Sequence, residues 1–449
     1  MNIIVIGGGK VGKKLVADFN REEHNVILID TKREITEQVQ DEYDVMGICG
    51  SGTDIEVLKE AGIKNTDLFI SVTEKDEFNA LCCVMAKNLG AKRCVARVRN
   101  TEYFKQIAYM RDVLGINLIV NPEYYAGREI ARNLRFPAAI KTETFAKGRV
   151  EMAEMLLPES LDGKALKEIY KTCRTKVLIC AVQREGTVEI PNGDFILRKG
   201  DRIHVTASHS DIAAFMEFAG VVSQPIKTTL IIGGGRIAYY LARQLVDSGI
   251  KVKIIEKDMK QCELLADNLP SGITIVCGDG TEQQVLDEEG INAYDSLVAL
   301  TGIDEENIIV SMYAKIKHMK KVITKIDRVT ISQVISATGI DSIITPQEIT
   351  ANTIIGYSRA MEASEGTEVR ALYRIVDGKA EAIEFRITQK SAITSVPLRD
   401  LKFKPNMLIA VILKGNKITI PDGNSTLEVG DTMILLTKQP VKKISEILA

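Results

Sequence analysis

The sequence predicts an α/β protein with two Rossmann-like, doubly wound parallel-sheet lobes (N-lobes), each followed by a small α+β lobe (C-lobe). Two observations predict this fold. First, a glycine-rich turn follows a short apolar run twice, as Gly7-Gly8-Gly9-Lys10-Val11-Gly12 and, at an offset of 226 residues (233 − 7), as Gly233-Gly234-Gly235-Arg236-Ile237-Ala238. Second, short apolar runs then alternate with helix-length amphipathic segments, the order that builds a parallel sheet covered by helices.

The expected strands of the first N-lobe are Asn2–Ile6, Val26–Asp30, Val45–Cys49, Leu68–Val72, Cys94–Val98 and Leu118–Val120. Two of the helices between them have a recognisable start. Thr31 with Glu34, and Thr53 with Glu56, have the spacing of a capping box, so both threonines are expected to cap helices.

The same order recurs over residues 226–345, with strands expected at Thr228–Ile232, Val252–Glu256, Ile273–Val276, Ser296–Leu300, Val322–Ile326 and Ser342–Ile344. The match extends beyond the glycines. It pairs Cys49-Gly50-Ser51-Gly52-Thr53 with Cys277-Gly278-Asp279-Gly280-Thr281, and Thr73, Asn79 and Arg97 with Thr301, Asn307 and Lys325. The second N-lobe is therefore a copy of the first.

The C-lobes repeat as well. Pro191-x-Gly193-x-x-x-Leu197-x-x-Gly200-Asp201 has the spacing of the segment from Pro421 to Asp431, and both Pro-x-Gly turns are expected to be hairpin connections. Each C-lobe is expected to end in a short helix, Asp211–Phe218 and Val441–Leu448. The expected domains are 1–122, 140–223, 226–345 and 365–449. Mostly helical segments, 123–140 and 346–364, link the lobes.

The bulk composition is that of a soluble cytoplasmic protein. The chain has 449 residues, of which 45% are hydrophobic and 26% charged, with a net charge of −2. This balance gives no field that would attract nucleic acid or anionic lipid, so neither is an expected partner. No apolar stretch is long enough to span a bilayer, and residues 2–6 read as a strand rather than as a secretory signal.

The glycine turns indicate nucleotide binding. One such turn is a weak signal, but here each is followed about 20 residues later by an acidic residue that ends a strand, Asp30 and Glu256. These carboxylates would accept hydrogen bonds from ribose hydroxyls, which favours NAD(H) over NADP(H). Lys10 and Arg236 follow the glycines, where a cation can meet a phosphate or simply face solvent.

Three further positions lie at the expected ligand edge of each sheet. The loops at Gly50 and Gly278 either border the adenine end of the crevice or only begin a helix. Thr73 and Thr301 end the fourth strand. Arg97 and Lys325 place a charge within the fifth strand, where it needs a partner. For Arg97 that partner is either a phosphate or an internal carboxylate, Glu74 or Asp76.

Catalytic groups are not evident in the sequence. A dehydrogenase needs an acid–base group and a substrate pocket beside the nicotinamide, yet the four histidines do not converge on either crevice. No metal-ligand spacing, Gly-x-Ser-x-Gly or Walker motif occurs. Nucleotide sensing is therefore favoured. An NAD-dependent oxidoreductase with an unrecognised substrate site and a free-standing nucleotide-dependent scaffold remain as alternatives.

The residues from Ile3 to Gly12, Asp30, the loop at residues 50–53, the run 72–79 and the run 96–99 resemble the domains that regulate potassium conductance (RCK or KTN domains). With both lobes present twice, the whole chain resembles the regulatory subunits of Trk-type potassium uptake systems. The resemblance implies binding of NAD(H), with ATP or ADP possible. It also implies a membrane potassium-translocating partner of the TrkH type, a homo-oligomer (a dimer or a tetrameric ring) and a peripheral position on the inner face of the cell membrane.

Carried over by motif, the first site comprises Gly7, Gly8, Gly9, Lys10, Val11, Asp30, Thr73, Glu74 and Arg97, and the second Gly233, Gly234, Gly235, Arg236, Ile237, Glu256, Thr301 and Lys325. The candidates also include Gly12, Thr31, Gly50, Ser51 and Thr53 in the first copy and Asp279 in the second. Ala238, Gly302 and Lys325 replace Gly12, Glu74 and Arg97 in the second copy. The first site is therefore the stronger candidate. The linker helices, with Ile130, Leu134, Ile354 and Ile355, are expected to carry a gating signal and to pack on a partner subunit or on their own sheet.

Overall fold

The computed structural model describes residues 1–135, 141–145, 150–221, 225–328, 340–364, 369–376, 379–415, 417–439, 441 and 443–448. The chain divides into two compact units. The first holds Met1–Ala131 and Lys227–Ser358, which are the two N-lobes. The second holds Arg132–Ile226 and Arg359–Ala449, which are the two C-lobes. Among the described residues, no helix is both long enough and apolar enough to cross a bilayer.

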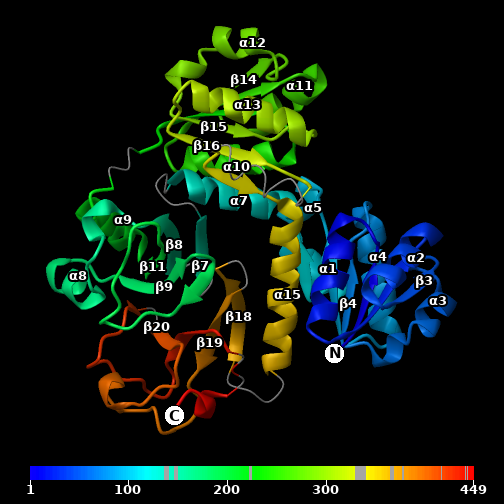
Figure 1. Ribbon diagram of the computed structural model, residues 1–449. Coiled ribbons are helices and arrows are strands. Elements are labelled where there is room, and N and C mark those ends of the chain that lie inside the picture. The colour runs from blue at the N-terminus through cyan, green and yellow to red at the C-terminus, as the bar shows by residue number, and fades with distance from the viewer. Residues whose placement is uncertain are drawn as a thin grey trace. The chain divides into compact units, whose positions relative to one another are not determined.

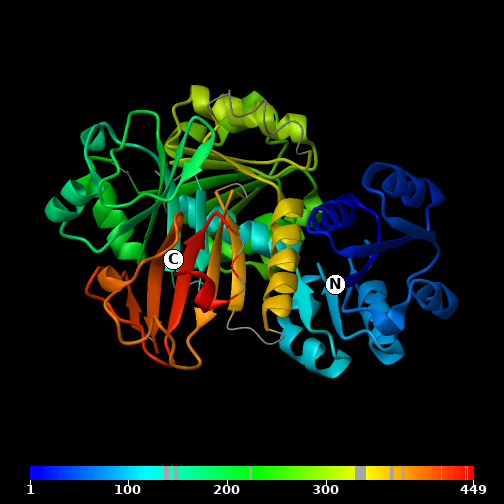
Figure 2. The ribbon, with the colours of Figure 1, turned by 60° about the horizontal axis from the view of Figure 1, so that its bottom comes forward.

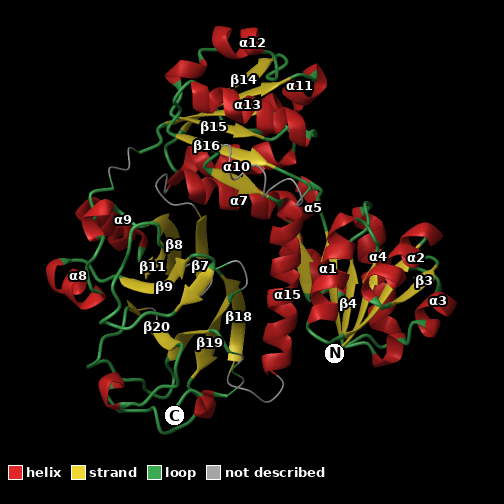
Figure 3. Ribbon diagram, viewed as in Figure 1, coloured by secondary structure: helices red, strands yellow, loops and turns green. Residues whose placement is uncertain are grey.

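The first N-lobe is a six-stranded parallel sheet in the order β3-β2-β1-β4-β5-β6, with helices on both faces (Figure 3). Its strands are β1 Asn2–Ile6, β2 Asn25–Asp30, β3 Met46–Cys49, β4 Leu68–Ser71, β5 Arg93–Arg97 and β6 Leu118–Val120. Its helices are α1 Lys10–Arg21, α2 Arg33–Tyr43, α3 Ile55–Glu60, α4 Asp76–Leu89, α5 Thr101–Lys105, α6 Ile107–Leu114 and α7 Pro122–Arg135. The apolar runs of the sequence are buried on both sides, as a helix-covered parallel sheet requires.

The second N-lobe repeats this sheet in the order β14-β13-β12-β15-β16-β17 (Figure 1). Its strands are β12 Thr228–Ile232, β13 Lys251–Glu256, β14 Ile273–Cys277, β15 Ser296–Ala299, β16 Lys321–Lys325 and β17 Ser342–Ile344. Its described helices are α10 Arg236–Asp247, α11 Met259–Asn268, α12 Gln283–Glu288, α13 Asp304–Ile316 and α15 Pro346–Ser364. The strand order reverses beside β1 and β12, so both glycine turns lie at a topological switch point, where ligands bind in this fold.

Each C-lobe contains a five-stranded antiparallel sheet. The first has the order β10-β9-β11-β8-β7, built from β7 Lys141–Phe145, β8 Val150–Leu156, β9 Leu178–Arg184, β10 Thr187–Glu189 and β11 Arg202–Ala207. The second has the order β18-β19-β22-β20-β21, built from β18 Val369–Ile375, β19 Ala380–Arg386, β20 Met407–Lys414, β21 Lys417–Thr419 and β22 Thr432–Thr437. The described helices of the first C-lobe are α8 Leu166–Thr172 and α9 His209–Phe218.

The two C-lobes share one core, in which Phe145, Cys180 and Ala181 of the first lobe cluster with Ala382, Val411 and other apolar residues of the second. The rings of Phe145 and Tyr373 pack at 5.1 Å between centroids. The C-lobe sheets therefore bury apolar faces against each other within a single chain.

The expected hairpin role of the Pro-x-Gly turns is wrong. The turn at Pro191 joins β10 to β11, but these strands lie on opposite sides of β9 and do not pair. The second copy is the same, because β21 and β22 flank β20. The strands that do pair next to these turns are β9 with β10 and β20 with β21.

Three other local expectations are also wrong. Asp54, not Thr53, caps α3, because its carboxylate accepts the amide of Glu56. Helix α2 begins after Lys32 with no side-chain cap, so Thr31 lies outside it. At the end of the second C-lobe, the described part of 441–448 contains a single short 3-10 turn, Ile444–Glu446, in place of a helix.

Each linker helix contacts the N-lobe that it does not belong to. A Cβ built on Gly127 of α7 would lie 3.1 Å from the backbone nitrogen of Leu241, so α7 packs closely on α10 of the second N-lobe. In the other direction, burial raises the pKa of Tyr357 on α15, and Arg93 on β5 of the first N-lobe lies close enough for its guanidinium to lower it. Figures 1 and 2 show α15 (gold) as one long helix alongside that lobe. Ile130, Leu134, Ile354 and Ile355 are all buried within one chain.

Candidate functional site

The first glycine turn is shaped by its neighbours. Gly7 has φ +96°, a backbone conformation that favours glycine, and a Cβ there would lie 3.0 Å from Cγ2 of Thr73. A Cβ at Gly12 would lie only 1.8 Å from the carbonyl oxygen of Gly7. The turn therefore passes tightly between the end of β4 and the start of α1. Nothing lies within 4 Å of a Cβ built on Gly9, which faces open space.

The acidic residue after β2 holds this turn in place. Asp30 Oδ2 accepts the amide of Gly8 at 2.7 Å, and Oδ1 accepts the amide of Lys32 at 2.8 Å. In the second copy, Glu256 accepts the amide of Gly234 at 2.6 Å. Carboxylate oxygens have several lone pairs, so each acid keeps acceptor capacity for a ribose hydroxyl.

An asparagine joins the ends of two neighbouring strands in both copies. The sequence pairs it as Asn79 and Asn307, but it is not among the candidate site residues. The buried Asn79 accepts from Ser71 Oγ and from the amide and hydroxyl of Thr73, and donates to the carbonyls of Thr73 and Arg97. Asn307 makes the same bonds to the backbone of Thr301 and Lys325. Its recurrence at equal spacing was the signal that could have identified it.

The guanidinium of Arg97 is only partly hydrogen-bonded within its own lobe. Its Nη2 donates to the carbonyl of Thr73 at 2.6 Å, whereas its buried Nε has no partner. Burial, with the nearby Arg99, lowers the pKa of Arg97. Within the described residues Arg97 has no ion pair. The Asp76 carboxylate instead accepts the amides of Arg99 and Asn100.

Two other cations at this cavity have carboxylate partners. Arg99 donates from Nε to Glu123 at 2.5 Å. Lys325, from the second N-lobe, lies 3.1 Å from the carboxylate of Asp327. Arg97 therefore places a half-buried charge, without an ion pair in the described chain, at this sheet edge, and such a charge gains from a ligand phosphate.

These groups surround a cavity of about 780 Å³, within the usual range for ligand sites. Candidate residues in its wall are Gly7, Gly9, Lys10, Val11, Asp30, Thr31, Gly50, Thr73, Glu74 and Arg97. The candidates Gly8, Gly12, Ser51 and Thr53 do not line it, and the hydroxyls of Ser51 and Thr53 are hydrogen-bonded to each other. Ile237, Lys325, Asp327, Pro346 and Gln347 of the second N-lobe complete it.

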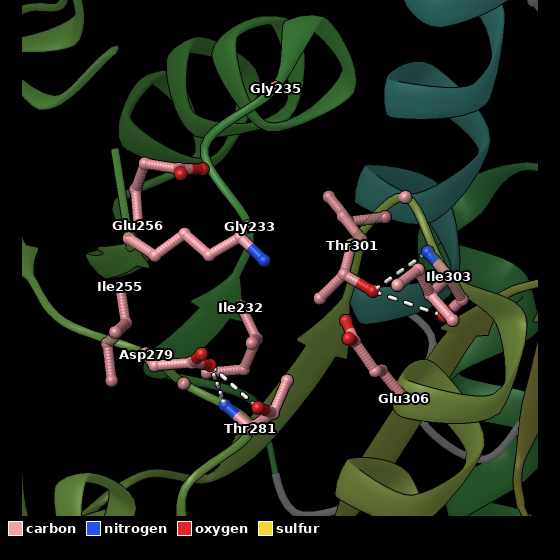
Figure 4. Close-up of a pocket in the computed structure, with 14 residues that line it drawn as sticks. Ile232, Gly233, Gly235, Ile255, Glu256, Asp279, Thr281, Thr301, Ile303 and Glu306 are labelled. Carbon is pink, nitrogen blue, oxygen red and sulfur yellow. Dashed lines mark hydrogen bonds between the residues drawn. The ribbon is translucent and has the colours of Figure 1, made fainter. Parts of the chain in front are cut away.

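The second cavity is smaller, about 310 Å³ (Figure 4). The candidates Gly233, Gly235, Glu256, Asp279 and Thr301 line it, with Gly302, Ile303 and Glu306. Asp279 is held by Thr281 rather than free, because it accepts both the amide and the hydroxyl of Thr281. Gly234 and the exposed Arg236 lie outside its wall, while Ile237 and Lys325 line the first cavity instead.

The first cavity fits a phosphate-containing nucleotide. It offers a helix N-terminus at Gly9 in open space, an acid beside the turn and the unpartnered Nε of Arg97. In the described part of the chain, no group of three or more acidic, histidine or cysteine side chains could hold a metal ion.

Comparison with known proteins agrees with this architecture. The TrkA-N domain model matches residues 3–122 and 229–346, and the TrkA-C domain model matches 152–220 and 382–449. The Trk system potassium uptake protein TrkA homolog of Archaeoglobus fulgidus is 32% identical over 451 aligned residues, covering 100% of both chains. The Trk system potassium uptake protein TrkA of Haemophilus influenzae is 29% identical, covering 97% of this chain and 95% of the relative.

Among solved structures, the GsuK channel bound to NAD has a similar fold, with a TM-score of 0.65 at 18% identity. The match covers 99% of this chain and 77% of that one. Two glycine-turn N-lobes, two antiparallel C-lobes and these full-length relatives lead to one conclusion: the chain belongs to the TrkA family of Trk potassium uptake proteins.

Proposed function

We propose that this chain is the cytoplasmic regulatory subunit of a Trk-type potassium uptake system. It binds NAD(H) in the first N-lobe, with ATP or ADP as competing ligands, and gates a TrkH-like membrane subunit that translocates potassium. The names of the full-length relatives support the transport role. The observation that carries nucleotide binding is the cavity in which the Gly7 turn, Asp30 and the unpartnered Arg97 Nε face one another.

The position of the cavity supplies a coupling mechanism. A ligand that joins the Gly7 turn to Arg97 also meets Lys325 and Asp327 of the second N-lobe. Its affinity then depends on how the two N-lobes pack, and by linkage its binding favours one packing over another. The linker helices α7 and α15 carry that preference onward, because each begins in one N-lobe and contacts the other.

We further propose that the chain acts as a homo-oligomer, a dimer or a tetrameric ring, on the inner face of the membrane. Light scattering of the purified protein measures the subunit number, and co-purification with the membrane subunit tests the partnership. A monomer that never associates with membranes would favour the free-standing scaffold instead.

Titration calorimetry with NADH, ATP and ADP tests the binding site. Asp30→Ala should weaken NADH binding at the first site at least tenfold, because it removes the ribose acceptor and the anchor of Gly8. Asp41→Ala, an exposed position on α2, is the matched control and should bind as the wild type does. Potassium flux through the membrane subunit should lose its NADH response with Asp30→Ala. An unchanged response would refute control by the first site.

The oxidoreductase alternative makes an opposite prediction. Incubation with NADH and carbonyl substrates should leave the nicotinamide absorbance constant if the bound nucleotide is a signal. Steady oxidation of NADH that depends on Arg97 or Asp30 would establish turnover and overturn the regulatory proposal.

A further inference from the structure

Two cysteines meet beside the second crevice. Cys277 ends β14, is exposed, and is in register with Glu256 of β13. Cys262 lies on α11 and is buried. The Cys262 thiol donates to the carbonyl of Glu256 at 3.4 Å, and the Cys277 thiol lies 3.9 Å from the carbonyl of Lys257. The two thiols are close enough for the Cys277 thiol to raise the pKa of Cys262.

The first N-lobe holds one half of this arrangement. Cys49 ends β3 in the same register with Asp30, is exposed, and lies 3.6 Å from the carbonyl of Thr31. The residue in the place of Cys262 is Thr36, at the repeat offset of 226 (262 − 36), whose hydroxyl bonds to the Arg33 carbonyl. Cys49 thus has the exposure of Cys277 without a partner thiol, which makes it an internal control.

The other described cysteines are poor reaction sites. Cys82, Cys83, Cys94, Cys173 and Cys180 are all buried. Exchange requires access of a reagent to one sulfur and a second thiol in reach to resolve the product. Within the described chain, Cys277 with Cys262 is the pair that combines an exposed thiol with a resolving neighbour.

We propose that Cys262 and Cys277 form a thiol–disulfide exchange site, where a low-molecular-weight disulfide oxidises the pair and weakens nucleotide binding in the second crevice. The effect on nucleotide binding rests on the proposed function, whereas the exchange reaction between the two cysteines does not. Disulfides that form in the cytosol are usually transient and are catalytic or redox-sensing.

The reaction balances in two exchanges. The Cys277 thiolate attacks one sulfur of the reagent disulfide, and one reagent thiolate leaves and takes up the proton that Cys277 lost. The Cys262 thiolate then attacks the Cys277 sulfur of the mixed disulfide, and the second reagent thiolate leaves with the Cys262 proton. Two protein thiols are oxidised to one disulfide, and one reagent disulfide is reduced to two thiols. Burial and the Cys277 thiol raise the pKa of Cys262 to about 11, so the exposed Cys277 attacks first.

Oxidation would act on the crevice through short connections. A disulfide fixes α11 to the end of β14, one residue before the loop that carries Asp279 and Thr281. It also removes the thiol that donates to the Glu256 carbonyl, at the residue whose carboxylate holds Gly234. The wall of the second cavity therefore changes when the pair closes.

The experiment uses full-length protein incubated with oxidised or reduced glutathione. Peptide mapping after alkylation should show a Cys262–Cys277 cross-link, reversed by dithiothreitol. Cys262→Ser should instead keep glutathione attached to Cys277, and Cys49 should carry glutathione without a cross-link. A wild-type protein in which Cys277 ends as a stable glutathione adduct, or stays unmodified while Cys49 reacts, overturns the exchange site.

The coupling is measured in the Asp30→Ala background, where the first site is disabled. NADH affinity at the second crevice should fall at least threefold on oxidation and recover on reduction. Cys277→Ser in the same background should show no change with glutathione. An affinity that oxidation leaves unchanged, or no binding at the second crevice even when reduced, overturns the coupling. Loss of NADH binding to the reduced wild type would instead count against the proposed function.

Discussion

Lys10 of the first glycine turn and Asp327 of the second N-lobe form an ion pair, with Nζ and Oδ2 3.8 Å apart. The same carboxylate lies 3.1 Å from Nζ of Lys325. In the first repeat the position of Asp327 is held by Arg99, at the offset of 228 that also pairs Arg97 with Lys325 (325 − 97), so the second copy has reversed the charge there. An acidic side chain from one N-lobe therefore lies beside the glycine turn of the other lobe's cavity.

This pair predicts that Asp327 selects against highly charged nucleotides. Asp327→Asn frees Lys10 and Lys325 for ligand phosphates, so affinity should rise for ATP more than for NADH, which carries fewer charges. The expected gain for ATP is roughly three- to tenfold at low salt, and it should shrink as salt screens the interaction. Calorimetry at two ionic strengths measures it. Asp112→Asn, an exposed acid on α6, changes net charge equally and should leave both affinities unaltered. Equal gains for both nucleotides would contradict selection.

Arg97 predicts opposite effects on binding and stability. Arg97→Met should weaken NADH binding by about ten- to a hundredfold, because a charged hydrogen bond to phosphate is lost. Unfolding in urea should show equal or greater stability for this variant, since a desolvated guanidinium with an unpartnered Nε is removed. Arg97→Lys imitates Lys325 of the second copy and should bind with intermediate affinity. If Arg97→Met unfolds at a lower urea concentration than the wild type and keeps full NADH affinity, Arg97 has a structural role.

Replacing the buried Asn79 should loosen the structure locally, and Asn307 in the second copy provides the comparison. Asn79→Ala leaves the Thr73 amide and the Arg97 carbonyl without their partner, at a cost of about 1–3 kcal/mol for each buried group. Hydrogen exchange should speed up in β4 and β5 more than in the rest of the first N-lobe. Asn307→Ala removes fewer hydrogen bonds and should loosen β15 and β16 less. A larger increase in exchange for Asn307→Ala than for Asn79→Ala would contradict the expectation that the effect follows the number of hydrogen bonds lost.

The N-lobe sheets could be predicted because their strands are buried on both faces and so appear as uninterrupted apolar runs. The run Ile3-Ile4-Val5-Ile6 is an example, and all four side chains are buried. The first two strands of each C-lobe, β7 and β8 and then β18 and β19, are not predicted from the sequence. In Val150–Leu156 the charged residues Glu151 and Glu154 are three residues apart, which does not fit the two-residue period of a half-buried strand.

The site could be predicted only within each copy. The spacing from the glycine turn to Asp30 is local, and the Gly8–Asp30 hydrogen bond follows from it. Lys325 and Asp327 reach the first cavity because the two N-lobes pack together through α7 and α10, contacts more than a hundred residues apart in sequence. No local pattern encodes that packing. The capping error at Thr53 is of another kind, because Asp54 one residue later is an equally good cap.

Lys321 predicts a pH dependence of stability in the second N-lobe. It is 2% exposed on β16, and burial lowers its pKa to about 8, although Asp341 acts in the opposite direction. An unfolded chain keeps this lysine protonated up to its usual pKa near 10.5, so between these values the unfolded state binds more protons. The free energy of unfolding should therefore rise as pH increases through about 8, and below that pH the folded state carries a penalty of roughly 3 kcal/mol.

Lys321→Met removes the penalty, so the variant should exceed the wild type in urea midpoint at pH 7 and lose most of that advantage by pH 9.5. The exposed Lys260→Met should show no such difference, and a gap that stays constant with pH would mean that Lys321 remains charged in the folded protein.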